Sequence, residues 1–119
     1  MFIARESRRP FNASLLPVEL AVSAITIGEL RAGVLTAVDL ASRTQRLDTL
    51  TTAMKLEPIP VDDEVATQWA LLRVTLRDLG ARMGINDSWI AATAMALAIP
   101  VATQDDDFPE LDGLELIRV

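Results

Sequence analysis

Short apolar runs alternate along this chain with longer stretches of helical periodicity. A short apolar run bounded by turn residues predicts a buried strand, whereas apolar residues that recur every three or four positions predict an amphipathic helix. Strands are predicted at residues 20–24, 99–103 and 114–119, and helices at residues 26–37, 39–56, 62–80 and 86–97. The alternation of strands and helices, with strands that are apolar on both faces, predicts an α/β domain with a mainly parallel sheet.

Two of the predicted helices carry an apolar stripe. The stripe of helix 39–56 consists of Leu40, Leu47, Leu50 and Met54, and that of helix 62–80 consists of Trp69, Leu72, Leu76 and Leu79. Together the two stripes present more apolar surface than a lone small domain buries, so we expect the protein to form a homodimer. The alternative is that both stripes are internal core.

Length and composition limit the class of protein. A chain of 119 residues that is 50% hydrophobic is expected to form one domain, spanning residues 1–119, with enough apolar material for a core. The sequence has no cysteine and no histidine, which excludes a disulfide scaffold, a thiolate metal site and imidazole catalysis. No apolar run reaches the roughly 20 residues that span a bilayer, so we expect a cytoplasmic protein without a membrane segment.

The charge balance is acidic, with a net charge of −6. This excludes a simple nucleic-acid-coating protein, which is usually basic, but it does not exclude a nuclease with an acidic metal pocket. Arginine is the basic residue throughout, apart from Lys55, and its planar guanidinium suits phosphate groups. Candidates for phosphate contacts are Arg5, Arg8, Arg9, Arg43, Arg46, Arg73, Arg77 and Arg82. For any single arginine, a solvated helix face is the competing interpretation.

Three acidic positions lie where a strand or loop meets a helix. Glu29 follows the first predicted strand by one helical turn, Asp87 opens the helix at 86–97, and Asp105 and Asp107 follow the strand at 99–103. In parallel α/β sheets, ligands bind beyond the carboxyl ends of the strands, so these carboxylates can converge there. Carboxylate oxygens without histidine or cysteine favour a hard divalent cation, which would activate water to hydrolyse a phosphodiester.

Each acid also has a purely structural interpretation. Glu29 stands three residues after Thr26, as in a capping box at the start of a helix. Asp87, beside Asn86, is a natural helix-start acid, and the aspartates from 105 onward can form a solvated turn. An isolated acid would therefore carry little weight.

Three sequence blocks occur together, in order. They read Ser-x-x-Thr-x-x-Glu-Leu-x-x-Gly at 23–33, Asn-Asp-x-x-Ile-Ala-Ala-Thr-Ala at 86–94, and Thr-x-Asp-x-Asp-Phe at 103–108. In sequence and order these blocks resemble the second, third and fourth conserved blocks of the VapC-type PIN-domain toxins. The intervening helices and the final strand agree as well, so the resemblance covers essentially the whole chain.

The resemblance implies a PIN-like fold and the toxin of a type II toxin–antitoxin system. It implies an endoribonuclease that uses Mg²⁺ or Mn²⁺ to cut RNA and that binds a cognate antitoxin. By position, Glu29, Asp87 and Asp105 match the catalytic acids, and Asp107 is an additional metal ligand. The chain departs from the pattern at its start, because residues 1–4 match only the positions after the first block of the family. We therefore expect the central first strand and its aspartate to be missing.

Two further functions stay open on the sequence. The missing aspartate could leave a catalytically impaired toxin that only binds its antitoxin or a full-length partner. A carboxylate-metal nuclease that acts on DNA would carry a similar set of acids.

Overall fold

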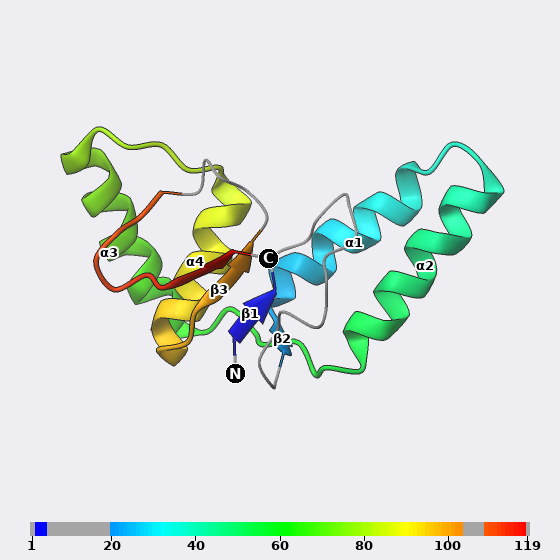
Figure 1. Cartoon of the computed structure of the whole chain (residues 1–119), viewed down its shortest axis with the longest axis horizontal. Helices are drawn as coiled ribbons and strands as arrows, with labels where there is room; N and C mark the ends of the chain where they lie inside the picture. Colours follow the sequence, from blue (N-terminus) through cyan, green and yellow to red (C-terminus); the bar gives the residue numbers. More distant parts are fainter. Residues whose placement is uncertain (1, 5–19, 104–108, 119) are drawn as a thin grey trace.

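The computed structural model describes residues 2–4, 20–103 and 109–118. The elements in these ranges are β1 (Phe2–Ala4), β2 (Leu20–Val22), α1 (Ala24–Thr36), α2 (Leu40–Met54), α3 (Asp63–Leu79), α4 (Ile85–Leu97), β3 (Val101–Thr103) and β4 (Leu116–Arg118). Two helical pairs, α1 with α2 and α3 with α4, spread from a small central sheet (Figure 1). The predicted α/β architecture is confirmed.

All pairings in the sheet are parallel, in the order β2-β1-β3-β4. Ile3 of β1 pairs with Ala21 on one side and with Val101 on the other. The expectation that the central strand is missing is therefore not confirmed, because β1 occupies that position. Strand β1 is only three residues long, but its backbone pairs with both β2 and β3. Neither neighbour therefore has unpaired backbone groups on the side of β1.

The segment after α2 extends the sheet beyond β2. The backbone of Ile59 donates to the carbonyl of Val22 and accepts from the amide of Ala24, each at 2.8 Å. Pro58 and Pro60 flank Ile59 and keep this stretch extended, because proline disfavours helix in the residue before it. This bridge fixes the point at which β2 turns into α1.

Helix α1 begins directly after Ser23, earlier than the sequence predicted. The Ser23 hydroxyl accepts from the amides of Ile25 and Thr26 at 3.1 and 3.2 Å, and its backbone is extended. Ser23 is therefore the N-cap, which corrects the prediction that Thr26 starts the helix in a capping box with Glu29. Glu29 lies inside the helix, too far from the N-cap to bond back to it.

Helix α4 also begins differently from the prediction. Its N-cap is Gly84, which has no side-chain cap, and not Asn86 or Asp87. Asp87 is instead the acidic residue of the first turn. Helix α4 packs against the sheet and α3 through Ile90 and several alanines, and Ile90 and Ala91 are fully buried.

The two helical pairs have separate apolar cores. The larger core joins α3, α4 and the sheet through Ala21, Leu72, Leu76, Ile90, Ala91, Ala94, Val101 and Leu114. The smaller joins α1, α2 and β2 through Val22, Ile27, Leu50 and Ala53.

The predicted apolar stripes are buried only in part. In α2, Leu50 is buried, but Leu40 is 79% exposed and Leu47 and Met54 are also exposed. In α3, Leu72 and Leu76 are buried, whereas Leu79 is exposed. The interpretation of both stripes as internal core is therefore wrong for these exposed positions, and an apolar surface is left for a partner.

Two stacked tryptophans join α3 to α4. The rings of Trp69 and Trp89 are nearly parallel, with centroids 4.4 Å apart. The indole nitrogen of Trp69 donates to the hydroxyl of Ser88 at 3.0 Å, and this hydroxyl in turn donates to the carbonyl of Ile85. The guanidinium of Arg73 lies 5.7 Å from the Trp69 ring on its side of α3. These contacts fix the first turn of α4, which carries Asp87.

Candidate active site

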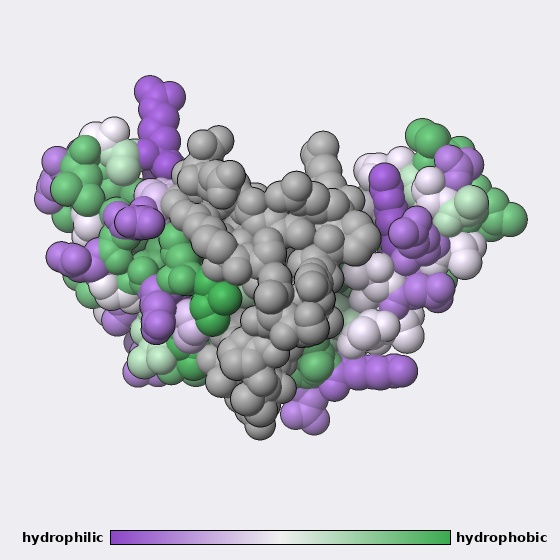
Figure 2. Space-filling model, in the orientation of Figure 1, coloured by the Kyte–Doolittle hydropathy of each residue, from purple (hydrophilic) through white to green (hydrophobic). Residues whose placement is uncertain are grey.

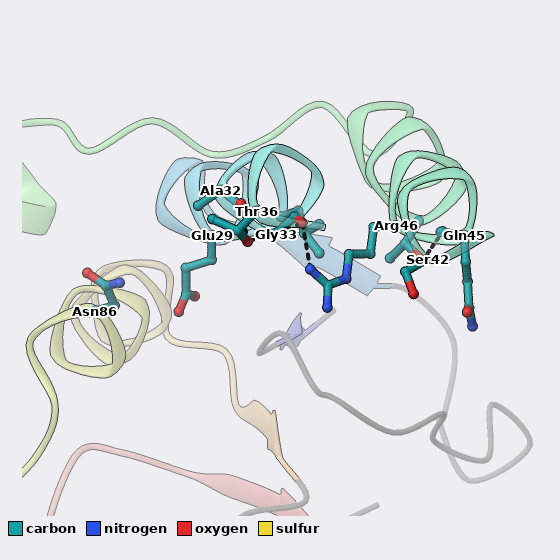
Figure 3. A pocket seen from close by; sticks show the side chains of 10 residues that line it. Glu29, Ala32, Gly33, Thr36, Ser42, Gln45, Arg46 and Asn86 are labelled. Carbon is teal, nitrogen blue, oxygen red and sulfur yellow. Dashed lines mark hydrogen bonds between the residues drawn. The ribbon is translucent and has the colours of Figure 1, made fainter. Parts of the chain in front are cut away.

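Glu29 projects from α1 toward the start of α4. Figure 3 shows its carboxylate directed away from the axis of α1, on the side where Asn86 of α4 lies. The Oε1 atom of Glu29 is buried, although the side chain as a whole is half-buried. Glu29 therefore lies where α1 approaches the start of α4.

Glu29 lines a cavity of about 810 Å³ together with residues of α1, α2 and α4. The lining residues are Glu29, Leu30, Ala32, Gly33, Thr36, Ser42, Gln45, Arg46, Thr49 and Asn86. Most of them carry hydroxyl, amide, carboxylate or guanidinium groups. The cavity therefore suits a polar or charged ligand rather than an apolar one.

Asp87 lies next to Asn86 in the first turn of α4 and is half-buried. A Cβ atom placed on Gly84 would lie 3.9 Å from the Oδ2 atom of Asp87, so this carboxylate folds back over the helix start. The hydrogen bonds of Ser88, the next residue, hold the turn in place.

The carboxyl end of β3 lies at the same edge of the sheet as the start of α1. Ala4 of β1 pairs with Val22 on one side and with Ala102 on the other, which places the ends of β2 and β3 level. Asp105 and Asp107 follow β3 in the sequence and lie outside the described residues. The structure thus brings Glu29 and the start of α4 to one cavity, while the positions of these two aspartates stay a prediction.

Oxygen donors for a divalent cation are present on both sides of this cavity. Glu29 and Asn86 line it and supply a carboxylate and an amide oxygen, whereas Asp87, the next residue of α4, is not among the lining residues. Carboxylate and amide oxygens are hard donors, which fits Mg²⁺ or Mn²⁺. Within the described ranges, however, no group of three or more acidic, histidine or cysteine side chains forms a metal cluster. The donor chemistry fits the cation, and a complete ligand set would need residues beyond those ranges.

The polar wall formed by α2 was not predicted from the sequence. Ser42, Gln45 and Thr49 recur every three or four residues and face α1 across the cavity, between the apolar positions of that helix. Arg46 was predicted only as one of several candidate arginines. The signal that could have identified this wall is the helical spacing of its polar residues, which reads equally well as a solvated face.

The charge at the start of α2 is fixed by a capping carboxylate. Asp39 is the N-cap and accepts from the amide of Ser42 at 2.7 Å and from its hydroxyl at 3.2 Å. These two bonds, the backbone one first, hold the pKa of Asp39 below its ordinary value of 3.8, with a smaller contribution from the charge of Arg46. An ionised carboxylate therefore stands beside the cavity wall at neutral pH.

Comparison with known proteins assigns the fold to a family. The PIN-domain family matches residues 3–114. Ribonuclease VapC5 of Mycobacterium tuberculosis is 49% identical over 122 residues, which cover 100% of this chain and 90% of that protein. Ribonuclease VapC4 of the same organism is 41% identical over 119 residues, which cover 100% of this chain and 92% of that protein.

Solved structures agree with this assignment. A chain of VapBC-5, a member of the VapBC family of toxin–antitoxin systems from Mycobacterium tuberculosis, superposes with a TM-score of 0.92 at 44% identity. The superposition covers 99% of this chain and 98% of that chain. A chain of VapBC2 from Rickettsia felis, bound to a DNA fragment from its promoter, superposes with a TM-score of 0.72 at 27% identity, over 84% and 74% of the two chains.

In the described ranges, no helix is long and apolar enough to cross a membrane. The family match over nearly the whole chain, the high identity to two VapC ribonucleases and the PIN-like arrangement of sheet and helices lead to one assignment. This chain belongs to the PIN-domain family, among its VapC-type members.

Proposed function

We propose that this protein is the ribonuclease toxin of a type II toxin–antitoxin system, an endoribonuclease that depends on Mg²⁺ or Mn²⁺. The observation that carries the proposal is that Glu29 and the start of α4 face one polar cavity. It is supported by the 49% identity to a protein named as a ribonuclease. The substrate we propose is single-stranded or looped RNA, because unstacked backbone can enter a cleft of this kind.

The proposed metal ligands are Glu29, Asp87, Asp105 and Asp107, the first three being the catalytic acids. A bound divalent cation would supply an activated water and offset charge on the phosphoryl oxygens. Within this chain, Glu29 lines the cavity, and Asp87 stands in the first turn of α4 next to the lining residue Asn86. Both carboxylates would offer oxygens to the cation.

The proposed partners are a cognate antitoxin and a second copy of this chain. Exposed apolar side chains gather at the far end of the α1–α2 pair, where Leu35, Val38 and Leu40 are 80%, 96% and 79% exposed (Figure 2). A second exposed apolar group, Leu71 and Val74, lies on α3. Apolar surface of this kind is a signature of protein partners. We further propose that the protein acts in the cytoplasm, where RNA substrates are found.

The test of the activity compares two substrates of the same sequence. A looped RNA and the corresponding DNA are incubated with the protein and Mn²⁺, and with EDTA as the control. We expect Mn²⁺-dependent cleavage of the RNA alone. Cleavage of the DNA would favour a DNA nuclease, and no cleavage together with retained antitoxin binding would favour an impaired toxin that acts only as a binding partner.

A second test reads out the metal without cleavage. Mn²⁺ should raise the melting temperature of the wild type, because a ligand that binds only the folded state stabilises it. Asp87→Asn should lose most of this shift. Equal shifts in the two proteins would contradict the proposed site. Light scattering over a range of concentrations tests the dimer, and a monomeric mass at every concentration would contradict it.

A further inference from the structure

Arg46 crosses from α2 to α1 inside the cavity that Glu29 lines. One of its terminal nitrogens donates to the carbonyl oxygen of Gly33 at 2.7 Å, and its Cδ atom lies 3.8 Å from where a Cβ on Gly33 would stand. The arginine stem therefore lies against α1 at van der Waals distance. The guanidinium is held at one place on the cavity wall, although the residue as a whole is exposed.

The Arg46 guanidinium contacts α1 about one helical turn from Glu29. Gly33 lies four residues after Glu29 in α1, which corresponds to about 6 Å along the helix axis. Figure 3 shows Glu29 and Arg46 on the same side of α1, with both side chains directed toward the open side of the cavity. A ligand that reaches Glu29 therefore passes Arg46.

Arg46 is the one cation that lines this cavity within the described part of the chain. The net charge of −6 repels a polyanion, so an RNA strand needs a local positive group to approach the acids. Four N–H groups of a guanidinium are free when one is used, and their planar fork matches the oxygens of a phosphate. Ser42, Gln45 and Thr49 add neutral polar groups along the same wall.

We propose that Arg46 is a substrate-binding residue that holds an RNA phosphate adjacent to the one that is cut, so that the strand runs along the groove between α1 and α2. The inference rests on the proposed ribonuclease function and adds to it the path of the substrate. Arg46 also fastens α2 to α1 through Gly33, and the test has to separate this structural contact from the contact with RNA.

The two roles separate by charge. Arg46→Gln removes the charge and shortens the side chain, so that it loses the bond to the Gly33 carbonyl, whereas Arg46→Lys loses the guanidinium fork but keeps the charge. Arg31→Gln is the matched control, because Arg31 is an exposed arginine of α1 that also reaches α2, where it donates to the sulfur of Met54 at 3.8 Å, but does not line the cavity. A labelled looped RNA is titrated with each protein in EDTA, where a metal-dependent enzyme binds without cutting, at several salt concentrations.

We expect Arg46→Gln to weaken RNA binding about tenfold and to reduce the slope of log Kd against log salt by about 0.7, the value for one phosphate contact to a single strand. Arg46→Lys should keep the slope, Arg31→Gln should bind like the wild type, and all melting temperatures should agree closely. An unchanged affinity and slope in Arg46→Gln would overturn the inference, as would equal losses in the Gln and Lys variants.

The failure of the inference is distinguishable from failure of the proposed function. Cleavage of the same RNA by the wild type with Mn²⁺ is measured in parallel. Cleavage that persists at the wild-type level in Arg46→Gln, with unchanged KM, would refute the role of Arg46 alone. A variant that binds RNA normally but loses affinity for the antitoxin would also refute it, since the groove would then belong to a protein partner.

Discussion

Ser88 connects the packing of α3 to the start of α4, and its replacement by alanine should destabilise the protein measurably. Ser88 is fully buried, accepts from the indole nitrogen of Trp69 at 3.0 Å and donates to the carbonyl of Ile85. Ser88→Ala removes both bonds and leaves the indole N–H without this acceptor. The change keeps the backbone and nearly the whole volume of the side chain.

The magnitude can be worked out from the two lost contacts. Loss of the hydrogen bond to Ile85 costs about 1 kcal/mol, and the indole N–H left half-buried costs about 1 kcal/mol, the lower end of its range. Alanine is the better helix former and offsets about 0.5 kcal/mol. We therefore expect the free energy of unfolding to fall by about 1.5 kcal/mol, which lowers the urea midpoint by roughly 0.5–1 M for a typical slope.

Urea unfolding followed by tryptophan fluorescence measures this change. Thr75→Ala is the matched control, because its hydroxyl is exposed and bonds only to the carbonyl of Leu71 within α3. A double-mutant cycle with Trp69→Phe should show coupling of about 1 kcal/mol, since each change removes the same bond. A loss below about 0.5 kcal/mol for Ser88→Ala, the scatter expected of a surface change, would refute the reasoning.

Three further changes test the fold. Leu72 is only 1% exposed, so Leu72→Ala should lower the free energy of unfolding in urea by about 2–5 kcal/mol. Leu71 is 56% exposed, so Leu71→Ala should change it little in a monomeric sample. Equal effects would contradict the assigned core. Gly80→Ala should cost about 1 kcal/mol, because Gly80 ends α3 with a φ of +65°, and a neutral result would contradict that backbone. The pKa of Asp39 is lowered, so its stabilising effect is present above 3.8 and is lost as the pH falls through the folded-state value. The difference in melting temperature between wild type and Asp39→Ala should therefore shrink below pH 3.8, and a constant difference would contradict the capping role.

The helices and the parallel sheet were predictable because their signals are local. The predicted helix 62–80 corresponds closely to α3, which spans Asp63–Leu79 between its N-cap Asp62 and its C-cap Gly80. The start of α1 was predicted wrongly because two hydroxyl residues, Ser23 and Thr26, both suit an N-cap. The bridge between Ser23 and Ile59 is a long-range contact that favours the earlier start, and the local sequence does not contain it.

The site was predictable only in part. The sequence predicted Glu29 and Asp87 through their place after a strand and at a helix start; the structure places Glu29 in the cavity, whereas of the start of α4 Asn86 lines it and Asp87 does not. The sequence did not identify the wall of α2, because a polar helix face reads the same whether it meets water or a groove. For the same reason, the apolar stripe of α2 did not reveal that Leu40 and Leu47 would be exposed, since burial depends on which helix lies opposite.

The central claim is that the carboxylate of Asp87 acts in a metal-dependent ribonuclease site. Single-turnover cleavage of a looped RNA by Asp87→Asn tests it most directly, with Mn²⁺ present and with Asp78→Asn on α3 as the control for loss of one exposed carboxylate. Replacing a residue that only supports a metal ligand lowers metal affinity or activity about 10–100-fold. Loss of a ligand itself should therefore slow cleavage at least about 100-fold. We therefore expect that loss in Asp87→Asn and a wild-type rate in Asp78→Asn. Cleavage by Asp87→Asn at the wild-type rate would contradict the account.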